Sequence, residues 1–454
     1  MMQALYKHLY RPIDIASLAF LRIMIGILAF ADLLGTWIYY HFWHNAFDPD
    51  QFQFTYYGFQ WVNPLPEPFM SVLFVVLLGL SIAVTLGWHF RATAPLLFVG
   101  FCYTFLLEKA HYLNHGYLFC WVLLVIAISP SWRECSLDVW RKPEKQRSQV
   151  PFWTLGIPLF LMSVVYFFGG LAKINPDWLR AMPLKLWLQA KVDTSVIGPI
   201  LEYEITAYFM AYGGLLLDLF VVPLLWWRRS RWLAFGMVLF FHFVNFLIFN
   251  IGIFPFLSVT LTSLFFPPSW PRQLLQWIGK KWSFLGKWQE IYRQRVVTET
   301  IKAPIWQADH KWRNVVLAGL ALLVCVQVFL PLRHHFLGKD VAWDENGHRY
   351  AWRMMLRSKS GHARFIVVNQ QGDSTKVSPR KELSNKQARK MPTHPDMILQ
   401  YAHHLRDQYD AQAVYADIRI RLNGGSYTPY IDPEANLVEE EWCFIGVPDW
   451  VLER

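Results

Sequence analysis

The sequence predicts a mainly α protein: a polytopic membrane helical bundle of about nine transmembrane helices, followed by a C-terminal α+β, β-rich extramembrane domain. Of the 454 residues, 54% are hydrophobic and 17% aromatic, which is more than ordinary soluble domains of this length carry. Long apolar runs occupy residues 1–332, whereas residues 333–454 contain none. The boundary between the two predicted domains therefore falls at residue 332.

Each apolar run approaches the length of about 20 residues that a helix needs to cross a bilayer. The third and the eighth runs are short. In chain order the runs cover residues 16–38, 69–88, 93–109, 115–130, 152–172, 205–227, 232–249, 251–266 and 313–332.

The basic residues predict the orientation of the chain, because cytoplasmic loops carry an excess of lysine and arginine. The N-terminus carries Lys7 and Arg11, and the loops after the fourth, sixth and eighth runs are basic. Nine spans then place the N-terminus in the cytoplasm and the C-terminal domain outside it. We expect residues 267–312, which are rich in tryptophan and basic residues, to lie on the cytoplasmic membrane surface.

The net charge of +10 does not indicate a nucleic-acid partner, because the basic residues lie between apolar runs and form no stripe with interleaved aromatics. The five cysteines form no CxxC pair and show no Cys/His spacing typical of a metal site. The sequence therefore predicts neither a metal nor a disulfide framework.

Residues 333–454 read as a mixed domain. Arg349 to Leu356, Ala363 to Asn369 and Val414 to Leu422 are rich in β-branched and aromatic residues, which favours strands. His394 to Tyr409 has the pattern of one helix.

Ionisable residues within the apolar runs are functional candidates, because a charge in the bilayer is costly. Arg22, Asp32 and Asp218 lie well inside such runs. Structural ion pairs or polar links between helices are the simpler interpretation of these three, since buried charges are tolerated when they are paired.

Lys173, His115 and His242 differ, because all three approach the outer half of the predicted bundle. An amine and two imidazoles at a similar depth indicate a proton-transfer site. The alternative is that Lys173 is a snorkelling anchor and that the histidines are satisfied polar residues.

Three segments around these residues carry specific motifs. Residues 168–178 read Phe-Gly-Gly-Leu-Ala-Lys-Ile-Asn-Pro-Asp-Trp, residues 112–118 read Tyr-Leu-Asn-His-Gly-Tyr-Leu, and residues 241–245 read Phe-His-Phe-Val-Asn. They resemble the catalytic-lysine, Asn-His-Ser-Tyr-Leu and His-x-x-Asn segments of the vitamin K-dependent γ-glutamyl carboxylase family, in a bacterial-type form with an HTTM-like membrane domain. Further shared stretches are 213–219, 249–255, 329–336, 350–355, 415–418 and 431–433.

The resemblance implies an enzyme that oxygenates vitamin K hydroquinone to its epoxide with O₂ and thereby carboxylates protein glutamate residues with CO₂. Lys173, as the general base, and His115 are the catalytic residues that it implies. Asn114, His242 and Asn245 would bind the quinone. No metal is implied, and the implied partners are a glutamate-containing protein or peptide and the lipid bilayer.

Four residues of the C-terminal domain match the family's substrate-facing strand: Trp352, Met355, Arg357 and Lys359. The resemblance implies that they face the glutamate, and the two cations would meet its carboxylate. The alternative for Arg357 and Lys359 is an ordinary solvated basic face.

Two departures separate this sequence from the animal enzymes of the family. The loop from Tyr40 to Pro68 lacks the cysteine that those enzymes pair with their lumenal domain, and they continue past the position of Arg454. We therefore expect a compact homologue in a bacterial inner membrane. The alternatives are a vitamin K epoxidase without carboxylation and a non-catalytic quinone- or lipid-binding membrane protein.

Overall fold

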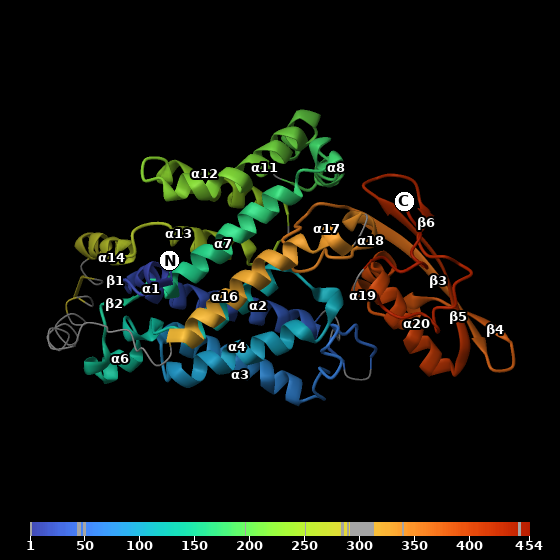
Figure 1. Cartoon of the computed structure of the whole chain (residues 1–454), viewed down its shortest axis with the longest axis horizontal. Helices are drawn as coiled ribbons and strands as arrows, with labels where there is room; N and C mark the ends of the chain where they lie inside the picture. Colours follow the sequence, from blue (N-terminus) through green and yellow to red (C-terminus); the bar gives the residue numbers. More distant parts are fainter. Residues whose placement is uncertain are drawn as a thin grey trace.

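The computed structural model describes residues 2–42, 47–48, 51–195, 197–249, 251–282, 286–287, 290, 313–337, 340–443 and 446–454. Long helices form a bundle, and a region with a four-stranded sheet lies at one end of that bundle (Figure 1). The N-terminus belongs to the bundle, and the C-terminus lies beside the sheet (Figure 1).

All the predicted apolar runs form helices, since a helix satisfies its own backbone polar groups where water is absent. They are α2 (Ala16–Phe42), α3 (Phe69–Leu86), α4 (Phe90–Leu106), α5 (Asn114–Ile128), α7 (Trp153–Ala172), α11 (Glu204–Trp226), α12 (Arg231–Ile248), α13 (Phe254–Ser263) and α16 (Arg313–Leu332).

The predicted count of nine membrane spans is not confirmed. Among the described residues, 6 helices are long and apolar enough to cross a membrane. The shorter apolar helices are α4, α5 and α13, with 17, 15 and 10 residues. We expected α4 and α13 to be short, but not α5. At 1.5 Å per residue, α13 reaches only about 15 Å, roughly half of the hydrocarbon core.

Short elements connect the long helices. At the end of the bundle away from the sheet, β1 pairs antiparallel with β2 near α14 (Figure 1). The surface segment predicted over residues 267–312 begins with α14, and most of its remaining residues lie outside the described ranges. These elements are α1 (Met2–Leu9), β1 (Pro12–Asp14), α6 (Leu137–Arg141), β2 (Gln149–Pro151), α8 (Pro176–Leu179), α9 (Leu184–Gln189), α10 (Gly198–Leu201) and α14 (Trp270–Lys281).

Two glycines allow α7 to pack closely on α11 next to Lys173. A Cβ atom at Gly170 would lie 2.8 Å from the Leu219 Cδ2 atom and 3.0 Å from its backbone nitrogen, so a larger residue would push the helices apart. A Cβ atom at Gly169 would lie 3.2 Å from Asp218 Oδ2. The Gly-Gly pair therefore sets the spacing that brings Asp218 to Lys173, the C-cap residue of α7.

The C-terminal region contains an antiparallel sheet in the order β4-β3-β5-β6. The strands predicted at 363–369 and 414–422 are confirmed within β3 and β5, and the helix predicted at 394–409 is α20. The elements are α17 (His334–Leu337), α18 (Val341–Asp344), β3 (Lys359–Asn369), β4 (Ser374–Val377), α19 (Asn385–Lys390), α20 (Pro395–Tyr409), β5 (Ala411–Leu422) and β6 (Thr428–Pro429).

The strand predicted over Arg349 to Leu356 is wrong. Tyr350, Trp352 and Met355 adopt φ angles of 63°, 57° and 52°, in the left-handed region that an extended strand does not use. The segment is irregular because it turns between the sheet and the bundle.

The turn between α4 and α5 joins the bundle to the C-terminal region. Glu108 Oε2 accepts a hydrogen bond from Gln387 Nε2 of α19 at 2.8 Å. The next residue, Lys109, places its Nζ atom 2.7 Å from Asp396 Oδ2 of α20, and Arg349 binds the same carboxylate at 2.7 Å. Although burial would raise it, Arg349 and Lys109 hold the pKa of Asp396 well below its usual range. This junction therefore fixes α5 relative to α19 and α20.

Candidate active site

A cavity of about 630 Å³ lies between the bundle and the C-terminal region. Its walls come from α5, α7, α11 and α12 of the bundle, the irregular segment before β3, and the neighbouring ends of α19 and α20. Trp352 and Lys359 are absent from these walls. The predicted site residues that line the cavity are Lys173, His115, Asn114, His242, Asn245, Met355 and Arg357.

Lys173 is buried on the bundle side of the cavity, with 6% of its surface exposed. Its Nζ atom lies 2.6 Å from Asp218 Oδ2 and donates a hydrogen bond to the Gly169 carbonyl at 3.2 Å. The same atom stands 5.3 Å from the centre of the Trp178 ring. Lys173 is thus a paired amine directed into the protein, and the ion pair expected for Asp218 forms with it.

The two histidines on the bundle side of the cavity flank one phenylalanine. The rings of His115 and His242 have their centres 5.9 Å and 5.7 Å from that of Phe254. His242 is 3% exposed, and within the described part of the chain neither of its ring nitrogens has a hydrogen-bond partner. Because buried polar atoms are normally satisfied, these nitrogens are available to a polar ligand.

Two asparagines accompany the histidines. Asn114 precedes His115 at the start of α5, and its Oδ1 atom accepts a hydrogen bond from the Tyr112 hydroxyl at 2.8 Å. Asn245 follows His242 by three residues on α12, a spacing that places both on the same face of the helix. The bundle side of the cavity therefore combines an ion pair, two imidazoles and two amides.

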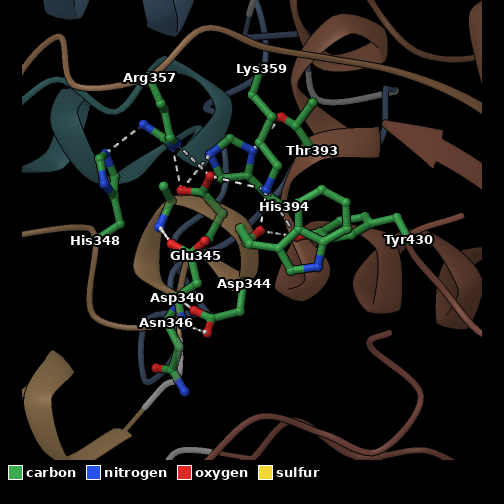
Figure 2. Close-up of polar contacts among 12 residues, drawn as sticks. Asp340, Asp344, Glu345, Asn346, His348, Arg357, Lys359, Thr393, His394 and Tyr430 are labelled. Atoms are coloured by element: carbon green, nitrogen blue, oxygen red, sulfur yellow. Dashed lines mark hydrogen bonds and ion pairs between the residues drawn. The ribbon is translucent and has the colours of Figure 1, made fainter. Parts of the chain in front are cut away.

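Glu345 is the common partner of several polar side chains on the C-terminal side of the cavity (Figure 2). Arg357 binds both carboxylate oxygens, with Nε at 2.6 Å from Oε1. Lys359 Nζ lies 3.3 Å from Oε1 and donates to the Tyr430 hydroxyl at 3.1 Å. His394 Nε2 lies 3.8 Å from Oε2. Burial lowers the pKa of Lys359 to about 8, and it also lowers the pKa of His394.

The residues predicted to face the glutamate substrate are therefore arranged differently from the prediction. Arg357 reaches the cavity, but Glu345 already occupies its guanidinium, and Lys359 is buried behind it. The two cations therefore form a buried ion-pair group and no solvated face. Trp352 is 1% exposed and packs against the ring of Tyr117 at a centroid distance of 5.4 Å.

Sequence reasoning did not single out Arg353 and Lys390, two charged residues that line the same cavity, and it gave Asp218 only as a structural ion pair. The charge of Asp218 inside an apolar run was a signal, but its partner was not visible from spacing. Arg353 stands directly before the Met354-Met355 pair of a matched motif, and Lys390 carried no signal in the sequence.

The fold and the cavity define an integral membrane protein whose helical bundle shares a buried polar site with a C-terminal region that contains a β-sheet. The family described as HTTM domain matches residues 10–270, and the one described as Vitamin K-dependent gamma-carboxylase, lumenal domain, matches residues 312–454. The chain therefore belongs to the vitamin K-dependent gamma-carboxylase family. No solved structure matches it.

Proposed function

We propose that the chain is a membrane enzyme that converts vitamin K hydroquinone to its epoxide with O₂ and uses this reaction to carboxylate protein glutamate residues with CO₂. Membership of the family supports the proposal. The observation that carries it is the continuity of the cavity: one side holds a buried amine–carboxylate pair and two imidazoles, and the other holds cations of the C-terminal region. A quinol and an anionic side chain can therefore meet in one space.

In this proposal Lys173 is the base that accepts a proton from the hydroquinone. The 2.6 Å contact lets its ammonium group first pass a proton to Asp218, leaving an amine beside a carboxylic acid. The pair rests as an ion pair, and burial lowers the free-energy cost of passing through these neutral forms relative to the same transfer in water. The amine can then accept the proton of the hydroquinone while Asp218 holds the first one.

The remaining polar groups on the bundle side would orient the quinol. His115 and Asn114 are the proposed donors to one quinone oxygen, where negative charge develops. His242 and Asn245 are the proposed contacts of the other, and the unsatisfied ring nitrogens of His242 support this role.

The overall reaction balances without a metal. One atom of O₂ enters the epoxide, and the other leaves as water together with the two hydrogens of the hydroquinone. The γ-carbon of glutamate loses its proton to the oxygenated quinol anion and gains CO₂, so that one proton is released overall. The orientation predicted from the charges, with the C-terminal region outside the cytoplasm, would bring the peptide from that side.

The test uses the purified protein in lipid nanodiscs with reduced vitamin K, O₂, labelled bicarbonate and a glutamate peptide. Epoxide and peptide-bound label are measured together. We expect both from the wild-type protein and neither from Lys173→Ala. The matched control is Lys185→Ala, which removes a lysine paired with Glu204 away from the cavity and should retain both products.

Three other results would each support a different conclusion. Full epoxide yield from Lys173→Ala would refute the assignment of the base. Epoxide without fixed CO₂ in the wild-type protein would identify an epoxidase that does not carboxylate. Quinone binding with no epoxide at all would identify a non-catalytic quinone-binding protein.

A further inference from the structure

The C-terminal side of the cavity holds more positive charge than its own carboxylates neutralise. Four cations there have a carboxylate partner. Lys109 and Arg349 share Asp396. Arg357 and Lys359 share Glu345 (Figure 2).

Two further cations line the same cavity without such a partner. Among the described residues, the side chains of Arg353 and Lys390 form no hydrogen bond and no ion pair, yet both contribute to the cavity wall. Burial lowers the pKa of Lys390 to about 8 and also lowers that of Arg353. Both are therefore partly desolvated positive groups that no carboxylate contacts directly, although the charge of Glu345 acts on both at longer range.

The segment that carries Arg353 also contacts the helix that carries the proposed base. Its neighbour Met354 lines the cavity, and the Met354 Cε atom stands 3.7 Å from the Cβ position of Gly169, one turn before Lys173 on α7. The segment that carries Arg353 therefore rests on the helix that carries the amine. An anion held by Arg353 would lie between the cations of the C-terminal region and the polar groups of the bundle.

A buried charge without a partner is costly, and the cost disappears when a ligand supplies the opposite charge. An arginine suits this role because its planar fork can bind both oxygens of one carboxylate. Arg357 cannot offer its fork without giving up Glu345, whereas Arg353 has no bond to break.

We propose that Arg353 and Lys390 bind the γ-carboxylate of the glutamate substrate, and that Arg357 and Lys359 only support the site from behind through Glu345. This assignment rests on the proposed function for the identity of the ligand. It also fits the chemistry of the product. Removing the γ-proton moves negative charge toward the carboxylate oxygens, and adding CO₂ leaves two carboxylates on one carbon. Two cations without a carboxylate partner stabilise both the developing negative charge and the dicarboxylate product.

Peptide binding tests the site without requiring turnover. A short fluorescent peptide with one glutamate is titrated into the protein in nanodiscs, and its counterpart with glutamine serves as the uncharged probe. We expect the wild-type protein to prefer the glutamate peptide. Arg353→Met and Lys390→Met should each weaken its binding about 30-fold or more, because each removes a desolvated partner of the charge. Arg353→Lys should recover part of the loss.

The chain offers matched controls. Arg389 precedes Lys390 on α19 but is exposed, and Arg364 is exposed on β3. Arg389→Met and Arg364→Met should bind the glutamate peptide like the wild-type protein. Thermal unfolding of every variant establishes that it is folded before its affinity is compared. Unchanged affinity in folded Arg353→Met and Lys390→Met would overturn the assignment.

Parallel turnover measurements separate this assignment from the proposed function. If the wild-type protein carboxylates the peptide and Arg353→Met retains its KM and kcat, the carboxylate site is wrong while the function stands. If the glutamate peptide binds through Arg353 but no epoxide or fixed CO₂ is formed, the function is wrong while the site stands.

Discussion

The ion pair between Lys173 and Asp218 should be detectable as an energetic coupling in the unfolding of the protein. At 2.6 Å and an effective dielectric constant of about 20, the attraction of two unit charges is about 6 kcal/mol. Removing both groups from water offsets part of this attraction. Breaking such a pair from one side leaves an uncompensated buried charge and typically costs about 3–5 kcal/mol.

The experiment is a double-mutant cycle. Asp218→Asn and Lys173→Met are each expected to lower the free energy of unfolding by about 3–5 kcal/mol. The double variant removes both charges, so it should recover most of that loss. Unfolding is followed by denaturant titration in micelles, and epoxide formation is measured on the same samples. The exposed Lys185–Glu204 pair provides the control cycle, which should show little coupling.

The outcome separates two descriptions of the pair. Strong coupling together with loss of epoxide in Asp218→Asn would agree with two roles for this carboxylate. It pairs with the charge of Lys173, and it accepts a proton from the Lys173 ammonium group. Additive losses in the double variant would refute the ion-pair reasoning. Normal epoxide formation in a folded Asp218→Asn protein would refute the proton transfer.

Three other perturbations have expected outcomes. Gly170→Ala should lower the melting temperature, with a cost of about 1–3 kcal/mol from the contact with Leu219, whereas Gly213→Ala, whose Cβ position has nothing within 4 Å, should not. Glu345→Gln should cost about 3–5 kcal/mol in denaturant unfolding, because two buried cations lose their partner. Burial raises the pKa of Glu108 from 4.5 to about 7, despite its hydrogen-bond donors. Because the pKa of Glu108 is higher in the folded protein than in the unfolded chain, the protonated form of Glu108 stabilises the fold. This contribution is complete below pH 4.5 and is lost as the pH rises through 7, roughly 3 kcal/mol in all. Glu108→Gln should abolish that slope in unfolding measured across the range.

The sequence was sufficient for the helices and for two strands, because apolar length and β-branched content are local properties. The strand predicted from aromatic content at Arg349 to Leu356 was wrong. Their left-handed φ angles arise from packing of this segment between two regions, which no local pattern records. The predicted number of membrane spans was not confirmed either, since α5 and α13 are shorter than a bilayer requires.

The candidate site shows the same division. Motifs identified Lys173, His115 and His242, and the structure brings them to one cavity. Charge compensation could not be read from the sequence. Arg357 is a cation in the right segment, but whether it is available depends on Glu345, which lies 12 positions earlier in the chain. A list of charged residues therefore does not reveal which charges remain uncompensated.

The turn that carries Glu108 and Lys109 limits how this protein can be recombined with its relatives. Asn114 and His115 follow this turn within six residues and stand in the cavity wall, while the turn itself is bound to Gln387 and Asp396. A chimera that takes its C-terminal region from another member of the family would have to supply matching partners at those two positions. Without them, the exchange would disturb α5 and the cavity wall, although no residue of the bundle had been altered.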